Sequence, residues 1–519
     1  MAAPKDWAPE AGRPLARFWR FRRCTRLARD EADAWLGGQV AAAAEGGLAG
    51  VGGLAPGVDE NWHARAVDRI RRYIAAGDCY QVNLTFPLEF FWFGAPLALY
   101  ARLRETQPVR FGGMIGDADG GIVSLSPELF VERCGDRLRT RPMKGTAPRA
   151  GDPAELLASP KERAENVMIV DLLRNDFGRI ARNGSVEVSG LFEIEEYPTL
   201  WQMVSEVTAD VPGRSLGEIL HALFPCGSIT GAPKIRAMQV AAELEEGRQR
   251  GPYTGAMGWV APDGDFRLNV AIRTLELLPG GQGRLGVGSG IVADSSPAAE
   301  WQECLLKAHF LREADPGLKL IETLRREDGR YPRLELHLQR LAASARWLGF
   351  AIDEEAVRER LAAMPAAGIW RVRLTVDKRG TVDTGCAPLT EEVPGRRLAV
   401  LADRRVDSRR LLQRHKTTAR HLYDAALQVL APGVFDVVFL NERGEVAEGA
   451  RSNVFVERDG LLWTPPLESG ALPGVLRAEL LAAGLAREAI LRLPDLADSF
   501  WLGNALRGLV PVELVVATA

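Results

Sequence analysis

The hydrophobic and polar positions of this chain change their period several times, and these changes predict its elements. Apolar residues recur at helical spacing through His63–Ile74,. The pair Gly77-Asp78 ends this predicted helix, and Tyr80–Phe86 then has the composition of a strand,. As far as about Ala314, strands and helices continue to alternate with short connections that contain Gly and Pro. This order predicts an α/β (α+β) fold.

The first sixty residues have weaker patterns. Arg17–Arg26 interleaves arginines with aromatic residues, which predicts a strand with a polar face rather than a nucleic-acid site,. Asp30–Ala44 predicts a helix, and the Gly- and Ala-rich stretch Gly46–Gly57 predicts a loop,. This part of the chain therefore indicates little about function.

Two neighbouring segments carry an acid and an amine sixteen positions apart. Val123–Glu132 is an apolar run with strand composition, and Arg137–Thr140 alternates out of a turn at Gly135-Asp136, which predicts a β-hairpin,. Glu128 lies on the first segment, and Lys144 follows the second. A carboxyl group that protonates a leaving group beside a lysine that attacks carbon would form a catalytic pair. The alternative is two surface residues on a hairpin.

The pattern changes again after Asp315-Pro316-Gly317, which predicts a linker between two domains, 1–314 and 315–519,. The elements predicted beyond it are strands at Leu318–Leu324, Trp370–Val376, Arg397–Ala402 and Val434–Leu440, a turn at Asp328-Gly329, a strand–turn–strand unit at Glu445–Phe455, and helices at Leu334–Leu348, after Lys416 and after Pro473-Gly474.

Composition narrows the function classes without choosing one. The 519 residues are too many for a single core, and the apolar share of 46% and charged share of 26% are ordinary for a globular protein,. A net charge of −3 provides no field that favours nucleic acid or an anionic membrane,. No apolar run has the length of a membrane span, and the N-terminus lacks a secretory signal, so a cytoplasmic protein is predicted,. The cysteines have no paired spacing, as expected for reduced thiols: Cys24, Cys79, Cys134, Cys226, Cys304 and Cys386.

Two predicted helices each place a pair of glutamates on one face. Glu162 and Glu165 are three residues apart, and so are Glu300 and Glu303, in a helix with Ser296 as its predicted N-cap,. Carboxylates from two helices could converge on Mg²⁺, which prefers oxygen ligands. Solvated helix faces are the alternative for either pair.

Three further stretches have features of anion sites. Ser228 and Thr230 come just before a helix predicted to start near residue 233, where free N–H groups favour a carboxylate or phosphate,. Gly288 and Gly290 would allow a close approach of the backbone,. Arg273 ends a predicted buried strand, where a bidentate carboxylate partner is expected,. The structural alternatives are a helix cap, a strand end and a paired arginine.

Lys416 is followed 32 residues later by Glu448 on a predicted strand. This pair would suit pyridoxal phosphate, because the lysine can form the imine while the carboxylate keeps the pyridine nitrogen protonated. Lysines and glutamates are common, so the spacing by itself does not separate this hypothesis from chance.

Residues 60–312 resemble the chorismate-utilising enzymes, a family that includes anthranilate, aminodeoxychorismate, isochorismate and salicylate synthases. The motifs that carry the resemblance are Ser-Pro-Glu128, Glu162-Arg-Ala-Glu165-Asn, Asp171-Leu-Leu-Arg-Asn-Asp176, Gly-Ser-Ile-Thr-Gly-Ala-Pro-Lys234, Ile-Arg273-Thr, Gly288-Ser-Gly290 and Glu300-Trp-Gln-Glu303-Cys-Leu-Leu-Lys307. Within this family, anthranilate synthases typically carry Ala where this chain has Lys144, whereas aminodeoxychorismate synthases carry Lys.

The resemblance implies a two-sheet fold and the amination of chorismate to 4-amino-4-deoxychorismate. Glu128 would protonate the departing C4 hydroxyl while Lys144 attacks C2, and ammonia would then add at C4 as the lysine leaves. The implied ligands of a Mg²⁺ ion that holds the ring carboxylate are Glu162, Glu165, Glu300 and Glu303. The implied substrate-binding residues are Ser228, Thr230, Tyr253, Arg273, Gly288, Gly290 and Lys307.

Residues 318–519 resemble the branched-chain-aminotransferase-like (fold type IV) pyridoxal enzymes. The motifs are His337-Leu-Gln-Arg340-Leu, Lys416-Thr and Glu448-Gly-Ala-Arg-Ser-Asn453, and Asn504-Ala-Leu-Arg-Gly508 is similar to the aminodeoxychorismate lyases. The resemblance implies that Lys416 forms the imine and shuttles protons, that Glu448 pairs with the pyridine nitrogen, and that Arg340 holds the phosphate. Ser452 and Asn453 complete the implied cofactor site. The product would be 4-aminobenzoate, released with pyruvate, for folate biosynthesis.

Three features depart from the family patterns. Gln202 stands where many chorismate enzymes have His, and we expect this change to be tolerated. Leu476 stands where fold type IV enzymes often have Thr, which would remove one hydroxyl from the phosphate site. The N-terminal region is short for the family, so a tryptophan site like that of some relatives is not expected.

The partners follow from the same resemblance. No segment resembles a glutamine amidotransferase, so a separate subunit is predicted to supply ammonia, and the C-terminal domain could form a homodimer. Two alternatives stay open: an anthranilate synthase with an unrelated pyridoxal domain, and a synthase whose C-terminal domain only dimerises and carries no cofactor.

Overall fold

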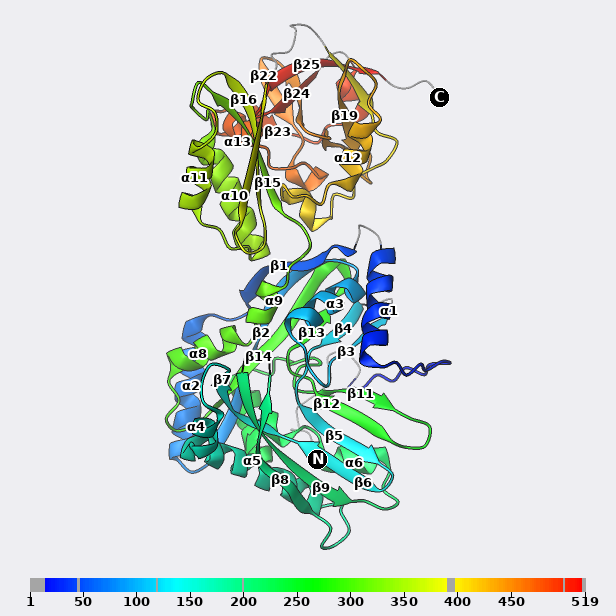
Figure 1. The fold of residues 1–519 in the computed structure, drawn as a ribbon, viewed down its shortest axis with the longest axis vertical. Helices are drawn as coiled ribbons and strands as arrows, with labels where there is room; N and C mark the ends of the chain where they lie inside the picture. Colours follow the sequence, from blue (N-terminus) through cyan, green and yellow to red (C-terminus); the bar gives the residue numbers. More distant parts are fainter. Residues whose placement is uncertain are drawn as a thin grey trace. The chain divides into compact units, whose positions relative to one another are not determined.

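The chain forms two compact units (Figure 1). The computed structural model describes residues 15–43, 47–117, 120–197, 200–389, 397–497 and 500–515. The first unit comprises the chain up to Val40, Leu54–Phe90 and Tyr100–Leu311, and the second comprises Ala41–Gly53, Phe91–Leu99 and the chain from Arg312. Among the described residues, no helix combines the length and the apolar composition needed to span a bilayer.

Two seven-stranded sheets form the framework of the N-terminal part. The first has the order β1 (Ala49–Pro56), β2 (Gln81–Gly94), β14 (Gln282–Ile291), β13 (Thr274–Leu277), β4 (Gly120–Ser124) and β3 (Gly113–Asp117), with β10 (Gly231–Ala232) beside β2. The second has the order β11 (Ala256–Val260), β12 (Phe266–Val270), β5 (Leu129–Cys134), β6 (Arg137–Arg141), β9 (Leu200–Asp210) and β7 (Met143–Pro148), with β8 (Glu187–Glu196) beside β9. The antiparallel pairing of β5 with β6 confirms the predicted hairpin.

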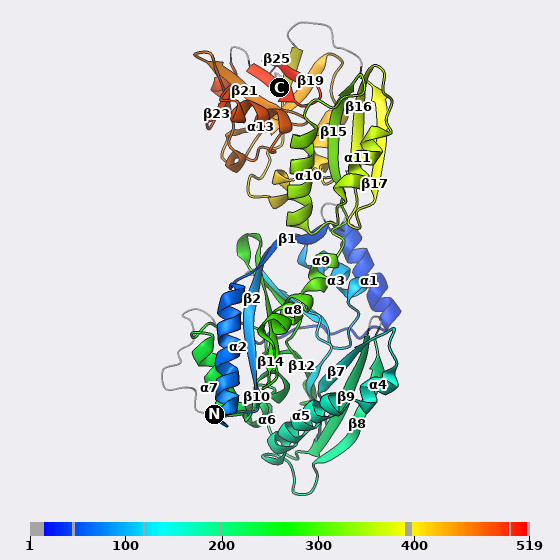
Figure 2. The same ribbon diagram turned by 90° about the vertical axis from the view of Figure 1, so that its left-hand side faces the viewer.

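Helices pack on both sheets. Figure 2 shows α2 alongside β2, and α5 against β8 and β9. The helices before the second unit are α1 (Arg29–Ala42), α2 (Glu60–Ala75), α3 (Pro96–Thr106), α4 (Pro153–Ala158), α5 (Pro160–Gly178), α6 (Leu216–Leu223), α7 (Lys234–Leu244), α8 (Pro297–Leu306) and α9 (His309–Glu313).

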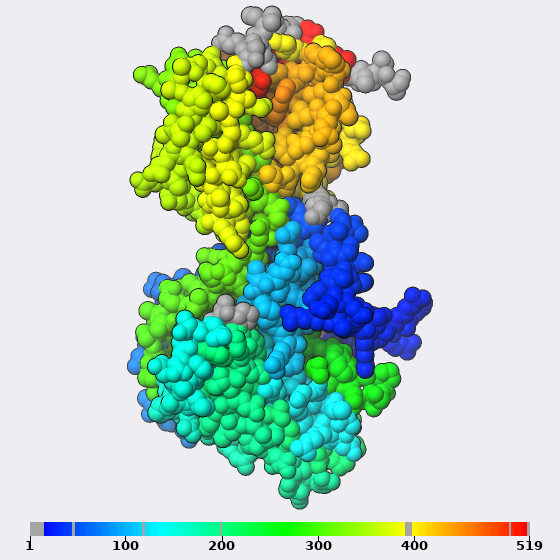
Figure 3. Space-filling view, viewed as in Figure 1, coloured from blue at the N-terminus to red at the C-terminus, as the bar shows by residue number. Residues whose placement is uncertain are grey.

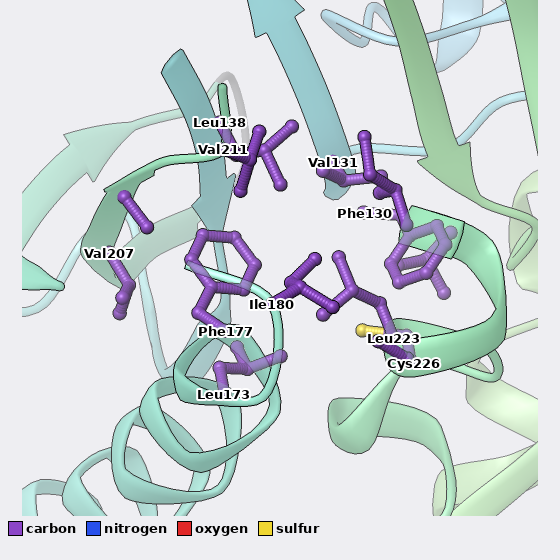
Figure 4. Close-up of a cluster of buried hydrophobic side chains, with 14 of the residues drawn as sticks. Phe130, Val131, Leu138, Leu173, Phe177, Ile180, Val207, Val211, Leu223 and Cys226 are labelled. Carbon is purple, nitrogen blue, oxygen red and sulfur yellow. The ribbon is translucent and has the colours of Figure 1, made fainter. Parts of the chain in front are cut away.

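Helix α5 is held by one apolar face. Ile169, Leu173 and Phe177 recur at intervals of four residues and are buried in the core under the second sheet, with Phe130 and Val207 among their neighbours (Figure 4),. Burial of each such side chain contributes about 1.5–3 kcal/mol relative to exposure. The core therefore fixes the helix against the sheet, while its first turns carry Glu162 and Glu165.

The second unit contains an antiparallel three-stranded sheet and a mixed eight-stranded sheet. The smaller sheet consists of β15 (Leu320–Glu327), β16 (Ile369–Val376) and β17 (Val382–Pro388). The larger has the order β20 (Val446–Gly449), β19 (Val434–Leu440), β18 (Arg397–Leu401), β25 (Gly508–Val515), β24 (Phe500–Asn504), β21 (Asn453–Arg458), β22 (Leu461–Thr464) and β23 (Ala486–Glu488). The helices are α10 (Leu334–Leu348), α11 (Glu354–Ala362), α12 (His421–Gln428) and α13 (Val475–Ala482).

Two predictions for the N-terminal region are wrong. Arg17–Arg26 forms neither strand nor helix, and Gly46–Gly57, predicted as a loop, contains β1. The predicted helix is present as α1, yet none of its residues is buried, and Figure 3 shows this dark-blue part of the chain on the outside of its unit. Without neighbouring apolar groups, the alternation of Arg and aromatic residues had no surface on which to form a strand.

The run Val123–Glu132 was expected to be one strand and is instead shared between the two sheets. β4 ends at Ser124 in the first sheet, and β5 begins at Leu129 in the second. Pro127, between them, has no N–H to donate to a ladder, and the Ser126 hydroxyl donates to the Val270 carbonyl at 2.6 Å,. Glu128 therefore lies where the chain crosses from one sheet to the other.

Candidate active sites

Glu128 is buried at this crossing, with 5% of its surface exposed. Burial raises the pKa of its carboxyl group to about 7, and the opposing effects of the Ser228 hydroxyl, the Lys144 amine and the Met143 backbone are smaller. Its Oε1 is buried without a hydrogen-bond partner among the described residues. A carboxyl group in this state keeps its proton near neutral pH and has an oxygen free to act.

Lys144 lies on β7, at an irregularity in the pairing of β7 with β9 between Met143 and Thr146. Bulges of this kind turn a side chain away from its regular direction. Burial lowers the pKa of the Lys144 amine, against the attraction of Glu165, and the electrostatic contribution of Glu128 shows that the two groups lie close together. The structure thus brings the predicted acid and amine together, because β5 and β7 belong to the same sheet.

Two polar side chains, Asn166 and Gln202, hold the strand around Lys144, and sequence reasoning assigned neither of them a role in the site. Asn166 on α5 donates to the Lys144 carbonyl at 3.4 Å and accepts from the Ser205 hydroxyl at 2.6 Å. Gln202 on β9 donates to the Gly145 carbonyl at 2.7 Å and accepts from the Thr146 hydroxyl at 3.0 Å. Gln202, which was expected only to be tolerated in place of His, therefore holds the backbone next to Lys144 by a hydrogen bond.

The predicted metal ligands lie on the helices where they were expected. Glu162 has a pKa raised first by burial and then by Glu165, and both Lys144 and Glu303 also act on it. Glu300 accepts from the Ser295 hydroxyl at 2.6 Å, and Glu303 pairs with Lys307 at 2.8 Å. No three His, Cys, Asp or Glu side chains of the described ranges form a ready metal cluster. The charges of Glu165 and Glu303 both raise the pKa of Glu162, and the role of the four glutamates as ligands stays a prediction.

Among the predicted substrate-binding residues, Lys307 and Gly288 are in contact, since the lysine donates to the glycine carbonyl at 2.8 Å. Ser228, in a short 3-10 turn, lies near Glu128, and the Thr230 hydroxyl donates to the Gly227 carbonyl at 3.1 Å. A side chain at Gly290 would collide with the ends of the Gln81 and Asn83 side chains of β2, so these two side chains pack closely on the glycine.

Arg273 lies between β12 and β13 with a positive φ of 47°, a strained conformation for a residue with a side chain,. Burial lowers the pKa of its guanidinium group. The expected carboxylate partner is absent from the part of the chain that the structure describes. A partly buried cation without a protein counter-charge is suited to an anionic ligand.

Tyr253 lines a cavity of about 470 Å³ on one face of the first sheet, together with Thr85, Thr274 and Gly286. Glu128 and Lys144 are not among its lining residues. Its ring lies where a side chain at Gly286 would be, and burial raises its pKa above the ordinary value.

In the second unit, Lys416 follows a short 3-10 turn and precedes α12, and its carbonyl accepts from Ile321 N at 2.9 Å. Burial lowers the pKa of its amine to about 8, assisted by Arg340 and Arg420 and opposed by Glu322 and Glu448. Two carboxylates and two arginines from separate elements thus surround one lysine. A lysine of lowered pKa is a suitable nucleophile for an aldehyde.

Glu448 on β20 is buried and accepts one hydrogen bond on each oxygen. The Tyr423 hydroxyl donates to Oε1 at 2.5 Å, and Leu472 N donates to Oε2 at 2.8 Å. Burial raises the pKa of its carboxyl group to about 7 against these donors. Tyr423, on α12, is a residue of this site that sequence reasoning missed, because its bond to Glu448 spans 25 positions.

Arg340 on α10 forms a bidentate ion pair with Glu322 of β15, at 2.9 and 2.6 Å, and also donates to the Pro473 carbonyl at 3.2 Å. The His337 ring lies 2.6 Å from the same carboxylate, whose pKa is lowered to about 2 against the effect of its burial, chiefly by Arg340. Arg340 is therefore held next to the segment that begins α13.

The segment before α13 is fastened by Asn453, which donates to the Leu472 carbonyl at 2.9 Å and fills the space where a side chain at Gly474 would lie. Ser452 is instead hydrogen-bonded to Asp436, inside the sheet. Leu476 is buried, with 4% of its surface exposed, so its apolar side chain belongs to the core.

Comparison with known proteins identifies both halves. Residues 23–313 match the profile of the chorismate binding enzymes. The chain belongs to this family. Residues 319–515 match the amino-transferase class IV profile, so the predicted combination of a chorismate-binding region with a fold type IV region is confirmed.

Each of three relatives matches part of the chain. Aminodeoxychorismate synthase component 1 of Bacillus subtilis is 41% identical over 271 residues, 51% of this chain and 57% of the relative. Anthranilate synthase component 1 of Streptomyces coelicolor is 40% identical over 309 residues, 58% of this chain and 60% of the relative. A crystal structure of a provisionally assigned amino-acid aminotransferase from Mesorhizobium loti is 41% identical and covers 38% of this chain and 100% of its own, with a TM-score of 0.36. The chain thus spans little more than half of these two synthases.

Proposed function

We propose that the first unit aminates chorismate to 4-amino-4-deoxychorismate and that the second eliminates pyruvate from this product to give 4-aminobenzoate for folate biosynthesis. The observation that carries the proposal is the neighbouring pair of Glu128 and Lys144, in which the buried acid has a raised pKa and the partly exposed amine a lowered one. A second partly buried lysine with a lowered pKa, Lys416, supports the second step.

In the first reaction, Glu128 gives its proton to the departing C4 hydroxyl while the uncharged Lys144 amine forms a bond to C2. Ammonia then adds at C4, and the bond to Lys144 breaks. Burial favours the neutral acid and the neutral amine, which are the reactive forms of both groups,. Arg273, without a protein carboxylate, would bind one of the substrate carboxylates, with Ser228, Thr230, Tyr253, Gly288, Gly290 and Lys307 as further contacts.

The acidic side chains near Lys144 fit a divalent cation. Burial, and then the charge of Glu165, raises the pKa of Glu162, and a cation between Glu162, Glu165, Glu300 and Glu303 would offset both effects,. Bound Mg²⁺ would supply a positive charge for the substrate's ring carboxylate. Glu303 also forms an ion pair with Lys307. If the cation replaced Lys307 beside Glu303, the lysine side chain would move toward the substrate.

The residues around Lys416 fit pyridoxal phosphate, because a lysine of lowered pKa, a buried carboxylate and an arginine beside a helix N-terminus are the groups that such a cofactor needs,. When bound, the cofactor would supply an electron-accepting ring. Lys416 would move the proton between substrate and product, Glu448 would face the pyridine nitrogen, and Arg340 would bind the phosphate beside the segment that Asn453 holds.

The experiment that tests the proposal is incubation with chorismate, ammonium and Mg²⁺, with and without added pyridoxal phosphate, followed by chromatography of the products. 4-Aminobenzoate and pyruvate are expected when the cofactor is present. Anthranilate as the main product would contradict the proposal for the first unit. Accumulation of aminodeoxychorismate despite the cofactor would contradict it for the second and favour a dimerisation role.

A further inference from the structure

Glu448 is the last member of a short series of hydrogen bonds that starts at Gln413 and passes through Tyr423. Gln413 Nε2 donates to the Tyr423 hydroxyl at 2.8 Å, and this hydroxyl donates to Glu448 Oε1 at 2.5 Å. Tyr423 and Glu448 are both buried, with 8% and 6% of their surfaces exposed. This series thus joins the segment just before Lys416 to the carboxylate on β20.

The direction of these bonds is set by the chemistry of the groups. The amide nitrogen of Gln413 can only donate, so the one proton of the Tyr423 hydroxyl is left for Glu448. Burial, and then the charge of Glu448, raise the pKa of Tyr423 well above its ordinary value, so the hydroxyl keeps its proton. The second carboxylate oxygen is already occupied by Leu472 N at 2.8 Å.

The surroundings hold the Tyr423 ring in one place. Its edge meets the face of Phe439, with ring centroids 5.0 Å apart and an interplanar angle of 77°. Both rings lie in a small core with Val406, Val437 and Ala447. The hydroxyl is therefore positioned before any cofactor arrives, and forming its bond to Glu448 needs no reordering.

The cations that face Glu448 are Lys416 and Arg420. Arg420 is engaged elsewhere, with Asp424 at 2.7 Å and the Ala450 carbonyl at 2.8 Å. Lys416 would lose its free ammonium form on joining the cofactor. Tyr423 is consequently the side chain that donates to Glu448 in a way that cofactor binding leaves unchanged.

We propose that Tyr423, supported by Gln413, is a positioning residue that keeps Glu448 ionised opposite the pyridine nitrogen of the cofactor. The inference rests on the function proposed above for the second unit. A carboxylate that accepts a strong hydrogen bond is less basic, so the shared proton stays on the ring nitrogen. Without the hydroxyl, that proton would move to Glu448, and the ring would become a poorer electron acceptor.

The test compares the wild-type protein with Tyr423→Phe and Gln413→Met after loading with pyridoxal phosphate. The readout is the absorbance of the lysine-bound cofactor at roughly 410–430 nm, where such adducts absorb, measured as a function of pH. The intensity of this band depends on the protonation of the imine. A positive charge on the ring nitrogen disfavours protonation of the imine. Loss of this charge in Tyr423→Phe therefore raises the midpoint of the pH titration of the band by about one pH unit, and Gln413→Met raises it by less.

Tyr331→Phe is the matched control, because it also removes a tyrosine hydroxyl of the second unit, one that donates to the Leu361 carbonyl at 2.8 Å. Its midpoint should equal that of the wild type. Unchanged midpoints in Tyr423→Phe and Gln413→Met would overturn the inference while the cofactor site stands. Absence of the band in the wild type would overturn the proposed function, and the inference with it. If Tyr423→Phe does not fold, Gln413→Met decides by the same criterion.

Discussion

Two glutamates of this protein have pKa values raised to about 7 by burial, yet they are prepared for opposite tasks. Glu128 has an oxygen without a partner, which favours the neutral form that can release a proton. Glu448 receives a donor on each oxygen, which favours the ionised form,. The difference lies in the neighbours of each carboxyl group and not in the depth of its burial.

Lys144→Ala should abolish formation of 4-amino-4-deoxychorismate, because the proposed reaction needs the Lys144 amine to bond to C2. Residual product, if any, should shift toward anthranilate, as expected from the Ala that anthranilate synthases carry there. Chromatography after incubation with chorismate, ammonium and Mg²⁺ measures both. Lys161→Ala, on the exposed first turn of α5, is the control that should keep activity. Wild-type turnover in Lys144→Ala would remove this lysine from the mechanism.

The synthase reaction should also report the titration of Glu128. Because the raised pKa is about 7, the carboxyl group carries its proton below this pH and loses it above, so turnover should fall as the pH rises through 7,. Initial rates between pH 6 and 9 at constant free ammonia measure this. Glu128→Gln should lower the rate by about 100-fold or more and leave no such fall. A flat profile for the wild type would argue against Glu128 as the acid.

At the scale of elements, the position of Lys144, the proposed catalytic lysine, depends on the hydrogen bonds that hold β7 to β9. Gln202→Leu removes the hydrogen bonds to Gly145 and Thr146, so β7 should become less well ordered beside Lys144. We expect about a tenfold loss of synthase turnover, equivalent to roughly 1.4 kcal/mol in the activation free energy. Turnover of added aminodeoxychorismate by the second unit is the internal control. If Gln202→Leu matches the wild type in both reactions, the fastening is not needed for catalysis.

The start of α13 should be equally sensitive. In Gly474→Ala, the new methyl group would collide with the Asn453 side chain and displace the start of α13, which the proposed cofactor site places next to Arg340,. The dissociation constant of pyridoxal phosphate, measured by titration, should rise at least tenfold, or about 1.4 kcal/mol. Gly385→Ala is the control, since open space surrounds that position. Equal dissociation constants for the two variants would exclude this segment from the cofactor site.

Most elements followed from the period of the sequence. Leu334–Leu348 and Val434–Leu440 match α10 and β19, because each has a continuous apolar face or core. The wrong predictions fall on stretches whose local pattern is compatible with two different structures. Val123–Glu132 reads as one strand, but only the arrangement of two sheets determines that the chain changes sheet at Pro127. Gly46–Gly57 reads as a loop, yet pairing in a sheet makes part of it β1.

At the scale of the whole molecule, the proposed synthase reaction needs a source of ammonia. We expect glutamine to support turnover only when a separate glutamine amidotransferase subunit is added, whereas ammonium should support it without one. The measurement is the rate of product formation with each nitrogen source, with and without the subunit. Equal rates with glutamine in both mixtures would contradict the need for a partner.

The sequence by itself determined the families of both halves and proposed the reacting groups, because motifs such as Ser-Pro-Glu128 and Lys416-Thr are local and keep their order along the chain. Tertiary structure decided how each group is prepared to react. The shifted pKa values of Glu128 and Lys144 depend on residues far apart in sequence. The same is true of the hydrogen bond from Gln202 to the Gly145 carbonyl and of the bond from Tyr423 to Glu448. A pKa depends on what surrounds a group in space, and spacing along a chain does not contain that information.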